Sequence, residues 1–234
     1  SRWKSSPRSC ASVSSCIARR VAFRVRWPHG IIRTDIDALF RRWGKRRRAR
    51  RVTAVAHRAF ANNDAVRDVA LPEGVVEVAS QAFASCVHLQ RVLLPESLEM
   101  IGAAAFRGCR DLREMRLPQR LATLPEQVFL RCFHLGEIVL PEGLEVIENE
   151  AFRKCGELRS IDLPSTVNWI GERCFKDCTS LEEITLPAGV RSLESQVFAG
   201  CVSLRTVHSA CALDYIAPDA FDGCPAIEVV PCAE

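Results

Sequence analysis

Cysteine is the residue type whose number and spacing offer the most chemistry in this sequence. Thiols can form disulfides, ligate zinc or act as nucleophiles. The chain has no C-x-x-C pair, and the spacing from Cys174 to Cys178 has no companion pair with histidine, so no zinc site is expected. Seven of the twelve cysteines recur every 23 residues: Cys86, Cys109, Cys132, Cys155, Cys178, Cys201 and Cys224.

A disulfide ladder is not expected from these recurrent cysteines either. If successive units stack as coils, neighbouring Cα atoms lie about 5 Å apart, which a disulfide can span. The stacked Cβ atoms point in the same direction, however, and that is poor disulfide geometry. We therefore predict buried free thiols that act as small apolar side chains. Cys174 takes the usual alanine position before the recurrent phenylalanine, and we predict that it also lies in the core.

No other pattern in the chain supports catalysis. The histidines His29, His57, His88, His134 and His208 fall in no recognisable catalytic motif. G-x-S-x-G, H-E-x-x-H and phosphate-binding loops are also absent from the sequence. We predict that the protein is not an enzyme, and that it has no catalytic residue, no metal, no cofactor and no small-molecule substrate.

The elements that position the thiols are copies of one 23-residue unit. Phenylalanine keeps this step in all eight units, and proline keeps it in six of them. No single unit can bury its apolar positions alone, so stacking in register is expected to create one continuous core. The phenylalanines are Phe60, Phe83, Phe106, Phe129, Phe152, Phe175, Phe198 and Phe221.

The clearest unit, residues 89–111, reads LQRVLLPESLEMIGAAAFRGCRD. Its L-x-x-V-x-L part alternates at period two and predicts a short strand, which Pro95 ends because proline has no N–H to donate. The following L-E-M-I-G turns apolar residues inward again, and Gly102 permits a tight turn. Ala105 and Cys109 lie four residues apart, which suits one helical turn facing the core.

The spacing L-x-x-I-x-L-P-x-x-L-x-x-I-G-x-x-A-F-x-x-C resembles the BspA-type class of leucine-rich repeat, over roughly residues 52–232. We expect a repeat solenoid of the α/β leucine-rich-repeat type, in which parallel short strands stack with helical or 3-10 turns. About eight 23-residue coils at the strand spacing of roughly 4.8 Å would be about 40 Å long. The chain departs from the pattern in two ways. Only Gly102 and Gly171 keep the glycine after the isoleucine, and Ser209 and Ala210 stand where Leu-Pro is expected. These departures affect local turns and leave the solenoid intact.

The resemblance implies a protein-binding or surface-adhesion module rather than a catalyst. We predict a non-catalytic protein–protein interaction module that binds another protein through the exposed face of the repeat sheet. In each strand, the residues on either side of the central apolar position point away from the core. These candidate ligand-binding residues are Arg91, Leu93, Glu114, Arg116, Glu137, Val139, Ser160, Asp162, Glu183, Thr185, Thr206 and His208. A solvated face that only keeps the solenoid soluble is the alternative.

Charge divides the chain into a basic arm and an acidic body. Residues 1–51 contain 16 Lys and Arg against two Asp, a balance of +14. Residues 52–234 contain 16 Lys and Arg against 26 Asp and Glu, a balance of −10. We predict a poorly ordered Ser- and Arg-rich arm over 1–33, a short amphipathic helix with a basic run over 34–51, and the leucine-rich-repeat solenoid over 52–234.

The amphipathic helix is expected to begin after Thr34 and to end at Gly44, with one apolar stripe between them. It would cover the open N-terminal end of the core as a cap. The basic run offers three other roles: binding nucleic acid or a nuclear import receptor, binding a calmodulin-like protein or an anionic membrane, and pairing with the acidic solenoid. The basic patch consists of Arg41, Arg42, Lys45, Arg46, Arg47, Arg48, Arg50 and Arg51.

The sequence gives two opposite indications of the cellular location of the protein. A row of reduced thiols and the lack of any N-x-S/T sequon favour an intracellular site, whereas the family resemblance suggests the cell surface. Because the chain begins with Ser1, the question of a preceding signal or transit peptide stays open. The eighth unit ends near Cys232 without a polar terminal repeat, so we expect that the natural chain extends further or that this end stacks on a partner.

Overall fold

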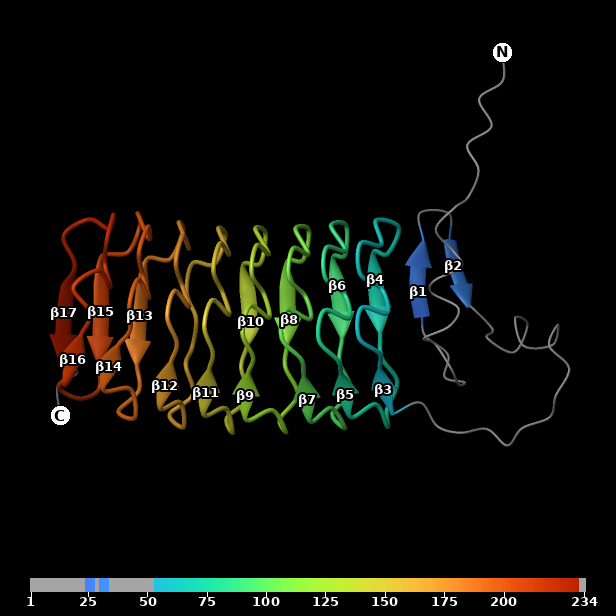
Figure 1. Ribbon diagram of the computed structural model, residues 1–234, viewed down its shortest axis with the longest axis horizontal. Coiled ribbons are helices and arrows are strands. Elements are labelled where there is room, and N and C mark those ends of the chain that lie inside the picture. The colour runs from blue at the N-terminus through green and yellow to red at the C-terminus, as the bar shows by residue number, and fades with distance from the viewer. Residues whose placement is uncertain (1–23, 28–29, 34–52, 232–234) are drawn as a thin grey trace, which may run out of the picture.

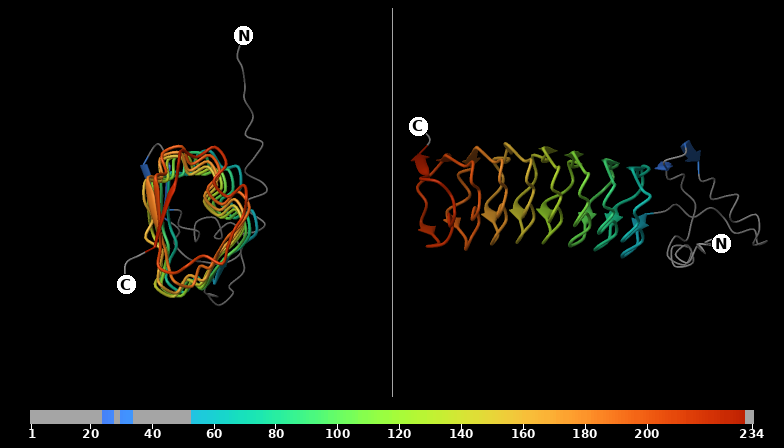
Figure 2. Two further views of the ribbon diagram at one scale, coloured as in Figure 1. Left: turned by 90° about the vertical axis from the view of Figure 1, so that its left-hand side faces the viewer. Right: turned by 90° about the horizontal axis from the view of Figure 1, so that it is seen from above.

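Parallel strands stacked at 23-residue intervals build a solenoid of about eight coils (Figure 1). The structure is a computed structural model that describes residues 24–27, 30–33 and 53–231, with side chains described over 53–230. Seen along its length, the coils superpose in one closed outline (Figure 2). The predicted repeat solenoid is therefore confirmed.

One side of the solenoid carries the strands that the L-x-x-V-x-L segments predict, which we call the long-strand side. Each strand pairs in parallel with the equivalent strand one coil away, as Met115 does with Ile138. The row is interrupted at residues 160–163, which form no strand. The strands are β4 (Asp68–Ala70), β6 (Arg91–Leu93), β8 (Glu114–Arg116), β10 (Glu137–Val139), β13 (Glu183–Leu186), β15 (Thr206–Ser209) and β17 (Glu228–Pro231).

A second row of two-residue strands follows the proline turns, and we call it the short-strand side. In each strand the second residue is the aliphatic one of the repeat, so it points inward while the first faces outward. These strands are β3 (Ala54–Val55), β5 (Glu77–Val78), β7 (Met100–Ile101), β9 (Thr123–Leu124), β11 (Val146–Ile147), β12 (Trp169–Ile170), β14 (Ser192–Leu193) and β16 (Tyr215–Ile216).

The recurrent phenylalanines form one internal column. Neighbouring rings from Phe60 to Phe221 stack with centroids 5.0–5.8 Å apart. The six rings from Phe83 to Phe198 have no exposed surface. Each coil thus buries one large aromatic side chain against the next coil, which is how a unit too small for its own core becomes stable.

The segment between the short and long strands, which we call the turn side, is a succession of β-turns. The described residues contain no helix, although the spacing of Ala105 and Cys109 predicts a helical turn. Alternate amides leave the coil: Gln81 N donates to Ala103 O (2.9 Å), whereas Ala82 N bonds back within its own coil to Ala79 O (3.2 Å). A helix would keep every donor inside the coil, so it cannot supply these bonds.

This alternation places left-handed backbone at two positions in each of the first seven coils, and at Gly223 alone in the last. Among the described residues, twelve other than glycine have positive φ, including Gln81 (φ 57°) and Ser85 (φ 58°). At the second position the chain also uses glycine, as at Gly108 (φ 74°). A left-handed conformation costs roughly 1–2 kcal/mol for an L-residue, which the bonds to the next coil offset.

The cysteines lie directly inside these turns and bond to the backbone of the preceding coil. The Cys132 thiol donates to Phe106 O at 3.2 Å, and the Cys109 amide donates to the same oxygen at 3.1 Å. Both lone pairs of the carbonyl are thereby used. The first unit has Asn63 in place of cysteine, and its Oδ1 accepts the Ala65 amide instead.

An antiparallel hairpin covers the N-terminal edge of the long-strand side. β1 (Arg24–Trp27) pairs with β2 (Gly30–Arg33) and with β4, in both cases antiparallel. These strands fall inside the predicted arm of residues 1–33, for which no strand was expected. The predicted helix over 34–51 lies outside the described residues. The hairpin itself pairs with β4 and so covers the sheet edge that an N-terminal cap must protect.

The last coil leaves its apolar ladder partly open. Ile216 is 42% exposed, whereas its equivalent one coil earlier, Leu193, is fully buried. The pairing also shifts here: Ile184 pairs with Val207 at a step of 23 residues, but Val207 pairs with Val229 at a step of 22. The one-residue slip places Val229, rather than Val230, beside Val207 on the core face, where Val229 is 39% exposed because no described coil covers it.

Truncation of one ring in the phenylalanine column should destabilise the solenoid according to its position. Phe129→Ala removes a fully buried ring between two others, so we expect a loss of about 3–5 kcal/mol in the free energy of unfolding. Phe221→Ala, in the half-buried last coil, should cost less than half as much. Denaturant titration followed by circular dichroism measures both, and equal losses would contradict a closely packed column.

Gly171 should be intolerant of a side chain, although it does not have positive φ. A Cβ there would lie 2.6 Å from Asn149 N and 2.9 Å from Glu148 C, so close approach of the coils requires glycine. We expect Gly171→Ala to cost about 1–3 kcal/mol. In the matched control, Gly143→Ala, the nearest atom is 3.7 Å away and the change should stay within about 0.5 kcal/mol. Similar losses for both in thermal unfolding would refute the close-approach explanation.

Candidate functional site

All twelve residues predicted for the sheet face lie on the long-strand side. Ten belong to strands β6, β8, β10, β13 and β15, while Ser160 and Asp162 lie in the interruption between β10 and β13. All are exposed except Thr206 and His208, which are half-buried. The structure therefore brings these residues into two parallel columns along the solenoid.

An aliphatic centre lies near the N-terminal half of this face. Leu93 and Val139 are 68% and 53% exposed, and Arg116 lies between them in the same column. Val139 pairs directly with Arg116 across β10 and β8. Two large aliphatic side chains on the outward side of a sheet contribute nothing to the core, so another contact is needed to remove them from water.

The charges of the long-strand side are mainly acidic. Asp68 accepts a hydrogen bond from Arg91 at 3.0 Å, and this bond, with the charge of Asp68, raises the pKa of the Arg91 guanidinium. In the described part of the chain, no ion pair involves the other charged residues of the face. These residues are Glu114, Arg116, Glu137, Asp162 and Glu183, four carboxylates against one guanidinium.

The interrupted strand opens a shallow hollow of about 150 Å³ in this face. Residues 160–163 line one wall and residues 183–185 line the other. Asp162 and Glu183 contribute one carboxylate from each side, so the hollow is acidic. The sequence pattern does not predict it, because Ile161 keeps the apolar period of a strand and is buried like its equivalents.

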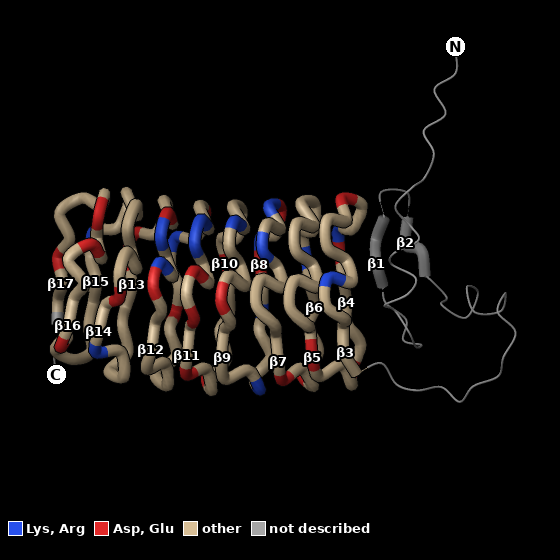
Figure 3. Tube along the Cα trace, viewed as in Figure 1, with Lys and Arg blue, Asp and Glu red and all other residues tan. Residues whose placement is uncertain are grey.

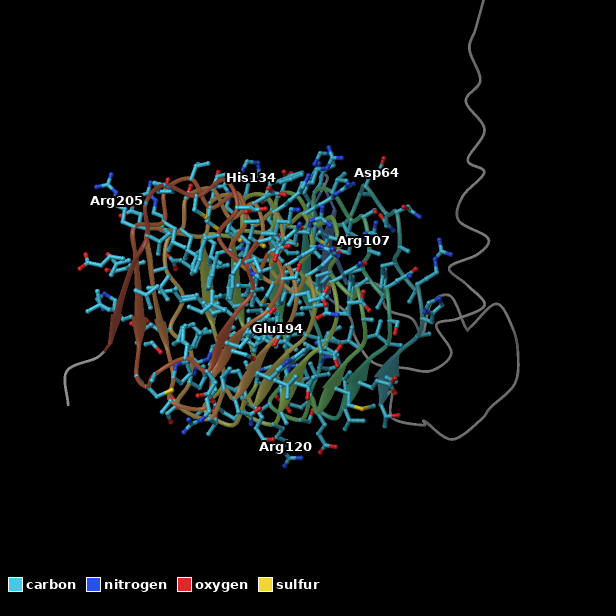
Figure 4. All side chains as sticks on the ribbon, turned by 60° about the vertical axis from the view of Figure 1, so that its left-hand side comes forward. Asp64, Arg107, Arg120, His134, Glu194 and Arg205 are labelled. Carbon is cyan, nitrogen blue, oxygen red and sulfur yellow. The ribbon has the colours of Figure 1, made fainter. Side chains whose placement is uncertain are left out.

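Sequence reasoning missed Asp68 as a member of the face. It lies 23 residues before Arg91 and pairs with it across β4 and β6, so the repeat step alone would have found it. Residues of the predicted basic patch, Arg41 to Arg51, lie outside the described residues, and their role stays a prediction. Figure 4 shows how other charged side chains, such as His134 and Arg120, project from different edges of the solenoid.

Seven thiols of the described residues are fully buried and held in their protonated form. Burial raises the pKa of Cys86 and of Cys132 to about 12, an effect that backbone hydrogen bonds partly oppose. Desolvation likewise raises the pKa of Cys109 well above its usual value. All nine cysteines of the described residues are free thiols. A protonated thiol is neither a nucleophile nor a metal ligand.

No group of three or more His, Cys, Asp or Glu side chains in the described part of the chain is placed to hold a metal ion. Across the same residues, no helix has the length and apolar character to cross a bilayer.

The chain belongs to the BspA type leucine-rich repeat family. Residues 49–155 and 100–228 match the family described as BspA type Leucine rich repeat region, in six copies. The predicted resemblance is therefore confirmed, and family and fold together are typical of protein-interaction or adhesion modules. A comparison with curated proteins found no match.

Solved structures that resemble this one include two bacterial leucine-rich repeat proteins. The leucine-rich repeat protein of T. pallidum is 39% identical, with a TM-score of 0.59, over 64% of this chain and 72% of that chain. A leucine-rich cell surface protein of Faecalibacterium prausnitzii is 22% identical, with a TM-score of 0.54, over 81% of this chain and 67% of that chain. The second likeness concerns the fold alone.

The protonated thiols predict a loss of stability at alkaline pH. The folded state keeps the proton of Cys132 up to about pH 12, whereas the unfolded chain releases it near pH 8.5. Stability is therefore fully present below about pH 8.5 and falls above it, by about 1.4 kcal/mol per pH unit for each such thiol. Denaturant unfolding between pH 8 and 10.5 measures this slope.

Cys132→Ala provides the control for the alkaline slope. The variant loses one titrating thiol, so its free energy of unfolding should fall less steeply above pH 8.5 than that of the wild type. An identical slope in the two proteins would show that Cys132 is not protonated in the folded state above that pH.

Proposed function

We propose that the protein is a non-catalytic interaction module that binds another protein through its long-strand side. The observation that carries the proposal is the exposed aliphatic pair Leu93 and Val139 in the N-terminal half of an otherwise polar and charged sheet face. Large apolar side chains surrounded by polar ones are the usual centre of a protein interface. Membership of a family of interaction and adhesion modules supports the same conclusion.

The charges on the face favour a partner with a basic surface. Glu114 and Glu137 lie beside the aliphatic pair, and Asp162 with Glu183 line the hollow further along. Complementary charge increases the rate of association and fixes the orientation of the partner. The long, regular face of stacked coils suits an extended partner surface rather than a small molecule. Arg116 would then meet an acidic or polar group of the partner.

Substitution of the aliphatic pair should abolish capture of the partner. We expect Leu93→Asp with Val139→Asp to lower capture by crosslinking from native lysate about tenfold or more, since interface centres contribute about 2 kcal/mol or more. The matched control is Met100→Asp with Thr123→Asp, which changes two exposed residues of the short-strand side. Quantitative mass spectrometry of the captured proteins provides the measurement.

A further variant, used as bait in the same capture experiment, separates this proposal from binding through the basic arm. Arg46→Gln, Arg47→Gln and Arg48→Gln reduce the charge of the arm and leave the solenoid unchanged. Partners that persist with this bait and disappear with the aliphatic variant support the long-strand side. Partners that persist with the aliphatic variant and disappear with the arm variant would overturn the proposal.

A further inference from the structure

A second candidate surface lies on the turn side of the first four coils. A hollow of about 220 Å³ opens there, and four of the residues that line it are arginines. These arginines are Arg58, Arg107, Arg110 and Arg131, and all four are exposed. No acidic residue lines the hollow.

This concentration of positive charge is opposite to the charge of the body. Residues 52–234 contain 16 Lys and Arg against 26 Asp and Glu, yet four arginines and no carboxylate meet in one hollow. Among the described residues, no ion pair involves any of the four. Their charges are therefore available to an anion from solution.

The repeat places these arginines around a floor of small residues. The second coil has Ala84 and Ser85 directly after its phenylalanine, whereas the third coil has Arg107 at the first of these positions and the first coil has Arg58 two residues before its phenylalanine. Arg58 and Arg131 have positive φ, and their amides bond to the next coil, Arg131 N to Arg153 O at 2.8 Å. The backbone that carries both arginines is thereby fixed.

Neighbouring side chains orient the other two arginines. An Nη of Arg107 donates to Gln127 Oε1 at 3.4 Å, and the Arg110 guanidinium lies 5.9 Å from the centre of the Phe133 ring. Guanidinium groups held in this way lose less freedom when they bind an anion. Their planar donors match the oxygens of sulfate and phosphate groups in a bidentate manner.

The hollow is too small for a whole ligand but continues into a row of basic residues. Pockets that enclose a drug-sized molecule measure about 300–1,000 Å³, so this one holds a charged group of a longer molecule. Beyond it, Arg153, Lys154, Arg173 and Lys176 continue the row over the next two coils, although Arg153 is paired with Glu150 at 2.6 Å. Figure 3 shows Lys and Arg gathered in the upper part of the middle coils. At roughly 4.8 Å per coil, the hollow and the row together extend about 24 Å, from the first coil to the sixth.

The backbone and the side chains around the hollow indicate which class of anionic polymer it can bind. Amides of the turn side bond to neighbouring coils, as Ser85 N does to Arg107 O, so no open edge can accept a peptide strand. No aromatic ring lines the hollow, so bases of a single-stranded nucleic acid have no surface on which to stack. We propose that the arginine hollow and the basic row bind the sulfate groups of a linear sulfated polysaccharide.

The first experiment compares two triple variants of the full chain that have the same net charge. Arg107→Gln, Arg110→Gln and Arg131→Gln remove the hollow, whereas Arg113→Gln, Arg159→Gln and Arg205→Gln remove exposed arginines elsewhere on the solenoid. Figure 4 shows Arg205 near the C-terminal end, away from Arg107. Titration with a fully sulfated heparin hexasaccharide should show affinity at least about tenfold weaker for the hollow variant and less than about threefold weaker for the control. Equal weakening would overturn the proposal.

A footprint on the wild-type chain separates the hollow from the basic arm. Modification of arginines by phenylglyoxal, followed by peptide mass spectrometry, is measured with the sulfated hexasaccharide and with its desulfated counterpart. We expect the sulfated sugar alone to protect Arg107, Arg110 and Arg131. Protection confined to residues 41–51, or stronger protection of the hollow by single-stranded DNA of equal charge, would overturn the proposal.

Discussion

The constraint on which this structure depends is the backbone hydrogen bonding from one coil to the next on the turn side. Every second amide there leaves its own coil, so each coil needs a neighbour whose carbonyl lies at the same height. A coil with one residue more or less would displace every later carbonyl by one position. The constant 23-residue step is therefore a requirement of hydrogen bonding as much as of packing.

Phenylalanine and cysteine act together within this constraint. The phenylalanine ring fills the core, and its carbonyl accepts the cysteine amide of its own coil and the thiol of the next coil. The pair thus joins packing, intra-coil and inter-coil bonding at one point. This role explains why a cysteine, rather than alanine, keeps the position in seven units, and why Asn63 can replace it where no described coil precedes.

Because backbone and interior provide the cohesion, the outward side chains are free to differ between the sides of each coil. The long-strand side carries aliphatic and acidic residues, whereas the hollow of the turn side is lined by four arginines and no carboxylate. The two surfaces differ in charge although they come from the same repeat. One chain can therefore present two surfaces to different molecules without a second domain.

The 23-residue period was sufficient to predict the coils, the two columns of the sheet face and the buried thiols, since each of these follows from alternation and stacking. The turn geometry was not predictable, because Ala105 and Cys109 face inward in a helical turn and in the observed β-turns alike. The arginine hollow was also hidden from the sequence. Its four arginines come from three coils and from four different positions of the repeat, and they meet only when the coils stack.

The hairpin of β1 and β2 has a consequence for self-assembly. A solenoid with two open ends can add copies of itself head to tail, and such heterologous contacts produce unlimited filaments. Here the antiparallel hairpin extends the long-strand sheet by two strands, about 10 Å, beyond β4. The short-strand side has no such extension beyond its first strand, β3, among the described residues. In this part of the chain the two sheets therefore end at different heights, so a second copy cannot pair with both sheet edges in register.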